Sequence, residues 1–220
     1  MDAGLADSDS FCLVTDRECG AESRFRDLGI RVKRACFEGD EDFSRVAAAY
    51  FSARGVDVVF LFYSRLVGPA LYASIPTINV HPSLLPMFRG FNAIDKTLAA
   101  GARFQGVTAH IVDSGADTGG ILVQSSVPLP LGADMEHARR TAYLQQVLVC
   151  LVCIDLLDSG RLRIAPEIQE CVWEGDVPVA PSVSPTFAGE KIATAYRRFL
   201  AGEQYRGICA DPLPRTAETE

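Results

Sequence analysis

Short apolar runs that alternate with segments of helical period are the feature that most constrains the fold of this chain. The run at 56–62 (VDVVFLF) is apolar on both faces once past Asp57, which is typical of a strand in a parallel sheet that helices cover on both sides. The preceding segment, 41–53, has apolar residues at helical spacing, and Gly55 ends it. This alternation predicts an α/β fold with a Rossmann-like, doubly wound, mostly parallel sheet.

The same alternation continues over most of the chain. The expected strands are 11–15, 30–36, 56–62, 77–80, 107–112, 121–127 and 161–164. The expected helices are a short one that ends near Leu28, then 41–53, 92–100, 134–158 and 191–200. After Gly160 the pattern changes, and a proline-rich connector (VPVAPSVSPTF) follows. We therefore predict one α/β domain over 11–162 and a short C-terminal extension over 163–220.

Composition and charge narrow the classes of partner. The 220 residues, 48% of them hydrophobic, suffice for one sizeable domain with a core. The formal net charge is −7 and no basic run is present, so we expect neither a nucleic-acid partner nor binding to a membrane surface. There is no stretch of about eighteen apolar residues, and the opening MDAGLADSDS lacks the features of a secretory signal. We expect a cytoplasmic protein.

The seven cysteines predict free thiols, since their number is odd and no secretory signal is evident. Cys150 and Cys153 form a CxxC motif inside the apolar segment YLQQVLVCLVCIDLL. One helical turn separates them, which favours a buried helix face. A metal site would need a second pair of ligands, and none has that spacing. We therefore predict core cysteines and no metal.

The stretch INVHPSLLPMFRG, at 78–90, ends a buried strand in an amide and an imidazole, Asn79 and His81. A second polar loop, VDSGADTGG, follows the strand 107–112 and contains Asp117. Ligands of open α/β sheets bind beyond the carboxyl ends of strands, so the two loops can meet in one crevice. An amide, an imidazole and a carboxylate suit acyl transfer to an amine without a covalent intermediate. A histidine before proline more often caps a loop, but its combination with Asn79 and Asp117 favours catalysis.

Three motifs carry a resemblance to a known family. The segment 79–86 (NVHPSLLP), followed by Gly106-Val107-Thr108 and Asp117-Thr118-Gly119, resembles the formyltransferases that use 10-formyltetrahydrofolate. These include glycinamide ribonucleotide, methionyl-tRNA and sugar-amine formyltransferases. The spacing 117 − 79 = 38 is similar to that of the glycinamide ribonucleotide branch. The resemblance covers about 11–162 and is strongest over 56–128, and such paired motifs are far more specific than a lone pattern.

The resemblance implies roles for individual residues. Asn79 would donate to the formyl oxygen, His81 would stabilise the tetrahedral intermediate and act as acid and base, and Asp117 would pair with His81 or hold a water that relays the amine proton. Other positions would bind the formyl donor: Ser64, Arg65, Leu66, Val67, His110, Val112, Asp113, Gly115, Ala116 and Gly119. Of these, Asp113 would contribute through its loop, while its side chain is structural. His110 would lie next to Asp117 and hold it in place. The predicted substrate contacts are Arg89, which is equally well a solvated loop charge, and Gln146.

The chain departs from the family pattern at its start. Family members usually open with a strand and a glycine-rich loop, which in the purine branch holds the substrate phosphate, but no apolar run precedes Phe11 here. Either that first strand is missing, or 11–15 takes the central place and an outer strand is lost. The first alternative would leave a gap or an open edge in the sheet, and an open edge favours a homodimer.

The same departure limits the acceptor. No phosphate loop is visible, and the position that supplies a ribose-binding glutamate in the purine branch is Gln146, so we do not expect glycinamide ribonucleotide. The charge argues against tRNA. We predict an enzyme that transfers the formyl group of 10-formyltetrahydrofolate to another small-molecule amine, in specialised metabolism. A formyltetrahydrofolate hydrolase and a non-catalytic folate-binding protein remain as alternatives.

Overall fold

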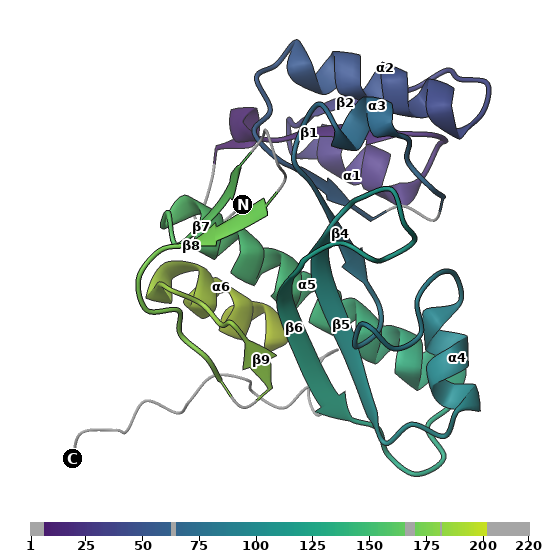
Figure 1. The fold of residues 1–220 in the computed structure, drawn as a ribbon, viewed down its shortest axis with the longest axis vertical. Coiled ribbons are helices and arrows are strands. Elements are labelled where there is room, and N and C mark those ends of the chain that lie inside the picture. Colours follow the sequence, from purple (N-terminus) through teal and green to yellow (C-terminus); the bar gives the residue numbers. More distant parts are fainter. Residues whose placement is uncertain (1–6, 63–64, 166–169, 181, 202–220) are drawn as a thin grey trace. The chain divides into compact units, whose positions relative to one another are not determined.

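The computed structural model of the chain describes residues 7–62, 65–165, 170–180 and 182–201 (Figure 1). It divides into two compact units, Met1–Thr77 and Ile78–Glu220. The division falls at the start of the strand that carries Asn79 and His81, and the sequence pattern did not predict it.

The first unit packs its helices on short strands. Its elements are a 3-10 turn Ser8–Ser10, β1 Cys12–Thr15, α1 Gly20–Asp27, β2 Arg31–Arg34, α2 Asp40–Ser52, β3 Val59–Leu61 and α3 Pro69–Tyr72. Three acidic residues in the first turn of α2 complement the positive end of the helix dipole. The apolar face of α2, which includes Phe43, Ala47 and Phe51, packs with Val59 and Leu71 in one buried cluster. This cluster is the core of the unit.

The pairing of β1 shows where residues 11–15 lie among the described strands of the first unit. β1 pairs with β2 in parallel, with Cys12 opposite Arg31 and Thr15 opposite Arg34. Among the described residues β1 pairs with no other strand, so 11–15 does not take a central place.

Strand β3 is shorter than the predicted strand 56–62. The side chain of Phe62, beyond the end of β3, is 62% exposed.

The second unit is built on an antiparallel sheet. Its elements are β4 Thr77–His81, α4 Ala93–Ala99, β5 Phe104–Ile111, β6 Ile121–Pro128, α5 Met135–Asp158, β7 Leu162–Ala165, β8 Glu170–Trp173, β9 Val183–Ser184 and α6 Glu190–Leu200. Strands β4, β5, β6 and β9 lie side by side in that order, and each neighbouring pair is antiparallel. β7 and β8 form a separate antiparallel pair.

The α/β class is confirmed, but the parallel direction expected of the sheet holds for β1 and β2 and not for the strands of the second unit. The reason lies in the connections. β5 and β6 are joined by a loop of nine residues, 112–120, and a short loop returns the chain antiparallel. The predicted pattern also missed the short elements α3, β8 and β9, whose few residues give little periodic signal.

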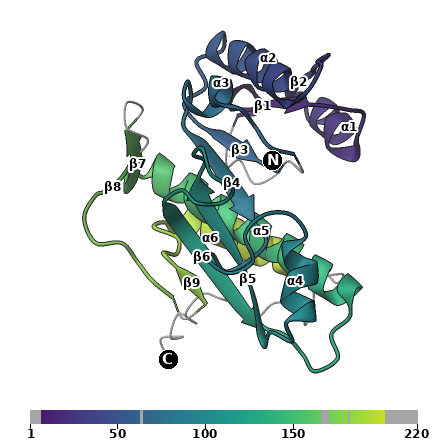
Figure 2. The same cartoon turned by 45° about the vertical axis from the view of Figure 1, so that its right-hand side comes forward.

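Helix α5 forms the core of the second unit. Its side chains Leu144, Leu148, Val152 and Leu156 are buried, and the helix packs on one face of β5 and β6 (Figures 1 and 2). By length and composition alone α5 could cross a membrane, but 56% of its most apolar window is buried within the protein. A helix in the core of a globular protein meets the same criteria of length and composition.

The two cysteines of the CxxC motif lie on this helix. Cys153 is fully buried. Burial raises the pKa of the Cys150 thiol to about 12 and that of Cys153 well above its ordinary value. Both thiols are therefore protonated at neutral pH and act as small apolar side chains in the packing of α5.

Residues on both sides of the predicted boundary at 162 belong to the same compact unit, because α6 packs on α5. A buried carboxylate joins the two helices. Asp155 of α5 accepts hydrogen bonds from the backbone N–H groups of Ala188 and Gly189, 2.5 and 3.0 Å away, at the start of α6. This contact fixes the angle at which the chain enters α6.

We expect Asp155→Ala to lower the free energy of unfolding by about 2 kcal/mol, because two buried N–H groups lose their acceptor. Urea unfolding followed by circular dichroism measures this change. Asp158→Ala is the matched control, since Asp158 is exposed on the same helix and should change stability by less than about 0.5 kcal/mol. Equal effects of the two substitutions would contradict the role of Asp155.

Candidate active site

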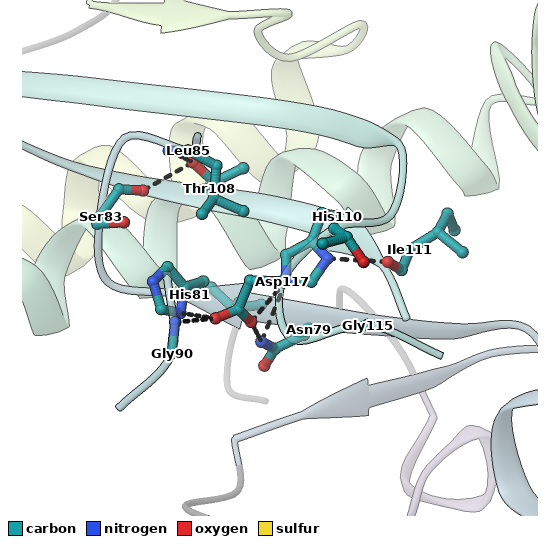
Figure 3. Close-up of polar contacts among 12 residues, drawn as sticks. Asn79, His81, Ser83, Leu85, Gly90, Thr108, His110, Ile111, Gly115 and Asp117 are labelled. Carbon is teal, nitrogen blue, oxygen red and sulfur yellow. Dashed lines mark hydrogen bonds and ion pairs between the residues drawn. The ribbon is translucent and has the colours of Figure 1, made fainter. Parts of the chain in front are cut away.

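The pleat of β4 places Asn79 and His81 on the same face of the sheet, because alternate residues of a strand point the same way. The antiparallel register then sets Asn79 opposite His110 and His81 opposite Thr108 on β5. The register therefore places four polar side chains on one face of the two strands, with Asn79, His81 and His110 gathered around Asp117 and Thr108 turned toward Ser83 and Leu85 (Figure 3). A strand that is otherwise buried ends in an amide and an imidazole because these side chains meet polar partners rather than core.

The loop between β5 and β6 brings Asp117 into this cluster. Oδ1 of Asp113 accepts hydrogen bonds from Gly115 N at 3.0 Å and from the Thr118 hydroxyl at 2.7 Å, which closes the loop. Gly119 lies against the carbonyl of Ile111 so closely that a Cβ would stand 1.9 Å from the oxygen. Asp117 itself has a φ of 54°, a conformation that aspartate tolerates better than most residues. The loop thus turns the Asp117 carboxylate inward.

Both oxygens of Asp117 contact the cluster (Figure 3). Oδ1 accepts from Asn79 Nδ2 at 3.1 Å and lies 3.3 Å from His110 Nε2. Oδ2 accepts from the backbone N–H of Gly90 at 2.7 Å and lies 3.3 Å from His81 Nδ1. Burial by itself would raise the pKa of Asp117, but the contacts with His110, Gly90 and His81 outweigh it and lower the pKa to about 2. The carboxylate is ionised at neutral pH.

This shift predicts an acid-sensitive contribution to stability. The folded pKa of Asp117 lies below its ordinary value of 3.8, so the contribution is fully present above about pH 4 and is lost as the pH falls toward 2. It amounts to about 2 kcal/mol. Urea unfolding at pH 6 and pH 2.5 should show the wild type losing that much more than Asp117→Asn; equal losses would show that Asp117 is not shifted.

His81 has one ring nitrogen fixed by the backbone. Its Nε2 lies 3.0 Å from the carbonyl of Phe88, which can only accept, so Nε2 carries a hydrogen. Burial lowers the pKa of His81, although the Phe88 carbonyl and Asp117 act in the opposite direction. The neutral ring therefore has its lone pair on Nδ1, beside the Asp117 carboxylate. Nδ1 is the atom at which this histidine can gain and lose a proton.

His110 is oriented in the same way. Its Nδ1 lies 2.8 Å from the carbonyl of Ile111 and so carries a hydrogen, which leaves Nε2 to accept from Asn79 Nδ2 at 3.2 Å. Asn79 therefore uses both amide hydrogens, one toward Asp117 and one toward His110. Its amide orientation follows from these partners, since the opposite one would turn Oδ1 toward a carboxylate.

The family described as formyl transferase matches residues 19–148, more than half of the chain. This chain belongs to the formyl transferase family. The phosphoribosylglycinamide formyltransferase of Mycobacterium tuberculosis (strain ATCC 25618 / H37Rv) is 32% identical over 162 residues, which are 69% of this chain and 75% of that protein. The trifunctional purine biosynthetic protein adenosine-3 of Drosophila pseudoobscura is 40% identical over 93 residues. These are 42% of this chain and only 7% of that protein's length.

Solved structures agree with this membership. Glycinamide ribonucleotide transformylase 1 from Symbiobacterium toebii superimposes with a TM-score of 0.67 at 30% identity, over 74% of this chain and 80% of that chain. A formyltetrahydrofolate deformylase from Pseudomonas syringae has a TM-score of 0.65 over 74% of this chain and 56% of that chain, and at 19% identity this likeness shows the fold alone. The formyltransferase-type fold, the class of one-carbon transferases and 10-formyltetrahydrofolate as the family's formyl donor are thereby confirmed at the level of the family.

The structure brings together most of the residues that the family resemblance singles out. Asn79, His81 and Asp117 are in contact, and His110 touches both Asn79 and Asp117. The other predicted donor contacts of the second unit lie on the loop that carries Asp117; they are Val112, Asp113, Gly115, Ala116 and Gly119. These roles remain predictions.

The predicted substrate contacts lie beside the cluster. The side chain of Arg89 is exposed, one residue before Gly90, and its carbonyl accepts from Lys96 Nζ at 2.8 Å. Gln146 of α5 donates from Nε2 to the carbonyl of Val80 at 3.1 Å, directly before His81 in the chain.

The remaining donor contacts belong to the first unit. Arg65 pairs with Asp40 at 2.8 Å, Leu66 is 58% exposed, and Val67 packs against the core cluster. Ser64 lies outside the described residues. Binding of the formyl donor by this segment stays a prediction of the resemblance.

Two polar side chains near the cluster were not among the predicted site residues. Thr108 and Gln124 stand opposite each other on β5 and β6 and hydrogen-bond the loop that follows His81. A signal was present, because Thr108 alternates with His110 on one strand face and belongs to a motif that carries the resemblance.

Proposed function

We propose that this chain transfers the formyl group of 10-formyltetrahydrofolate to the amine of a small-molecule acceptor. The observation that carries the proposal is the Asp117 carboxylate, whose two oxygens lie within 3.3 Å of polar nitrogens of Asn79, His81 and His110. Formyl transfer needs a hydrogen-bond donor for a developing oxyanion and a buried group that moves a proton. The cluster offers both.

The proposed reaction has two steps. The amine attacks the formyl carbon, the carbonyl oxygen becomes an oxyanion, and the amine nitrogen gives up a proton. The carbonyl then forms again, the bond from the formyl carbon to N10 of the folate breaks, and N10 takes up a proton. Nδ1 of His81 accepts and returns that proton, while ionised Asp117 stabilises the imidazolium that exists in between.

Asn79 donates to the oxyanion in this proposal. Because both of its amide hydrogens are engaged in the structure, one must be exchanged for the formyl oxygen. The oxyanion would then take the freed N–H.

The acceptor that we propose is an amine other than glycinamide ribonucleotide, the substrate class in the names of the relatives. At the position expected to meet a ribose, Gln146 has a neutral amide whose N–H is already donated to Val80. A place in specialised metabolism, a cytoplasmic location and a homodimer are part of the same proposal. A second candidate is hydrolysis of 10-formyltetrahydrofolate, in which water replaces the amine, because His81 Nδ1 beside ionised Asp117 would accept a proton from water as it does from an amine.

Release of tetrahydrofolate tests these functions. The protein is incubated with 10-formyltetrahydrofolate alone and with a panel of amines that includes glycinamide ribonucleotide and sugar amines, and absorbance follows the product. Release that depends on an amine supports transfer and names the acceptor class. Release without an amine supports hydrolysis, and binding of the folate without release overturns both in favour of a non-catalytic binding protein.

A further inference from the structure

We propose that Gln124, together with Thr108, is a positioning residue that holds the segment 82–92, the His81 loop, in contact with His81 and Asp117. The inference rests on the proposed function, because it assigns a role in the same site. Neither side chain touches His81 or Asp117 through any hydrogen bond seen among the described residues. Their effect on the site would pass through the loop.

The hydrogen bonds of Gln124 and Thr108 form a closed set. Gln124 Nε2 donates to Thr108 Oγ1 and to the carbonyl of Leu85, both at 2.9 Å. The Thr108 hydroxyl donates to the carbonyl of Ser83 at 2.7 Å and accepts from Leu85 N at 3.1 Å (Figure 3). A hydroxyl has one hydrogen and two lone pairs, and an amide nitrogen has two hydrogens. Every one of these is used, so the direction of each bond is fixed.

The anchored residues continue directly into the part of the loop that meets the site. The Ser83 hydroxyl donates to the carbonyl of Met87 at 2.7 Å, and Met87 N donates to the carbonyl of Leu84 at 2.9 Å. Leu84 in turn packs on Gly106 so closely that a Cβ there would stand 2.2 Å from its Cγ. The loop is therefore held to β5 and β6 at 83–85 and folded onto itself as far as 87.

The next residues give the site two backbone groups. The Phe88 carbonyl accepts from His81 Nε2, and Gly90 N donates to Asp117 Oδ2. Phe88 has a φ of 54°, an unfavourable conformation for a bulky side chain that persists only where the surroundings hold it. Gly90, at φ 76°, adopts its conformation freely. Phe88 is thus the residue whose geometry depends on the anchor.

The consequence is chemical as well as structural. The Phe88 carbonyl keeps the hydrogen of His81 on Nε2 and so leaves Nδ1 for proton transfer, while Gly90 N–H fixes the oxygen that faces Nδ1. A loop released from Gln124 and Thr108 would leave His81 free to exchange tautomers and would loosen Asp117. Loss of such positioning commonly costs about 100-fold in rate.

The test uses the full chain with Gln124→Met, which keeps the length of the side chain but cannot donate. Thr108→Val removes the hydroxyl, and Thr108→Ser restores it. Gln105→Met is the matched control, because Gln105 of β5 also donates its Nε2 to a backbone carbonyl, that of Ala138 at 2.8 Å, and is buried. Four quantities are measured: the 15N chemical shifts of the His81 ring, the amide signal of Gly90, the melting temperature and kcat/KM. The ring signals of His81 can be resolved because the chain has only three histidines.

We expect Gln124→Met and Thr108→Val to mix the two His81 tautomers, shift the Gly90 amide and lower kcat/KM between 10-fold and 100-fold. Thr108→Ser should restore the wild-type values, and Gln105→Met should lower the melting temperature without moving the His81 signals. An unchanged His81 tautomer and Gly90 amide in both Gln124→Met and Thr108→Val would overturn the proposal. The NMR signals can be measured without turnover, so the two proposals are tested separately. If the variants mix the His81 tautomers but the wild type transfers no formyl group, the positioning role is supported and the proposed function is overturned.

Discussion

Asp117→Asn is expected to lower kcat/KM for tetrahydrofolate release by about 10³-fold while the protein stays folded. Asparagine keeps the size of the side chain and one acceptor oxygen, so the backbone N–H of Gly90 need not lose its partner. What disappears is the negative charge, which is fully present at neutral pH because the pKa of Asp117 is about 2. A neutral amide lacks the negative charge that stabilises an imidazolium at His81 Nδ1, 3.3 Å away.

Steady-state kinetics with a saturating acceptor, together with circular dichroism and thermal unfolding, measure this loss. Asp95→Asn is the matched control: Asp95 is an exposed carboxylate in the first turn of α4, and its removal should leave kcat/KM within about twofold. The main result should be a fall in kcat, because the charge acts on the transition state more than on binding. A variant with wild-type kcat would exclude Asp117 from the chemistry.

The three side chains of the cluster could be predicted from the sequence for a simple geometric reason. Residues two apart on a strand share a face, so Asn79 and His81 had to point together, and a short glycine-rich loop after β5 had to return near the same edge. The hydrogen bonds that define their protonation could not be predicted. They depend on the carbonyls of Phe88 and Ile111, and a carbonyl is present at every residue of a chain.

The errors in the fold have a physical cause as well. An apolar run shows that a strand is buried but not which neighbour it pairs with or in which direction, so the antiparallel order of β4, β5, β6 and β9 was not visible. Gln124 was missed because one polar residue in a strand usually faces solvent. Its partner, Thr108, is found only once the register of β5 and β6 is known.

Asn79→Asp is expected to lower kcat/KM between 10²-fold and 10³-fold, since a hydrogen-bond donor to the oxyanion is lost. The same substitution is expected to reverse the pH dependence of the free energy of unfolding. In the wild type burial lowers the pKa of His81, so the folded protein binds fewer protons than the unfolded chain below about pH 6.5, and stability rises with pH. The new carboxylate would lie about 3 Å from Asp117 Oδ1, where Asn79 Nδ2 now lies at 3.1 Å. Two carboxylates at that distance share a proton, and the pair retains it to a higher pH than either does alone.

The sign follows from proton counting. A folded state that holds an extra proton is more stable at low pH, and that stability is lost as the pH rises through the raised pKa of the pair. Between pH 5 and pH 7 the free energy of unfolding should therefore fall with pH in Asn79→Asp and rise in the wild type. Asn79→Ala should match the loss of activity without the reversed slope. Parallel slopes for Asn79→Asp and the wild type would mean that residues 79 and 117 are not neighbours in the folded protein, and the charged cluster on which formyl transfer depends would not exist.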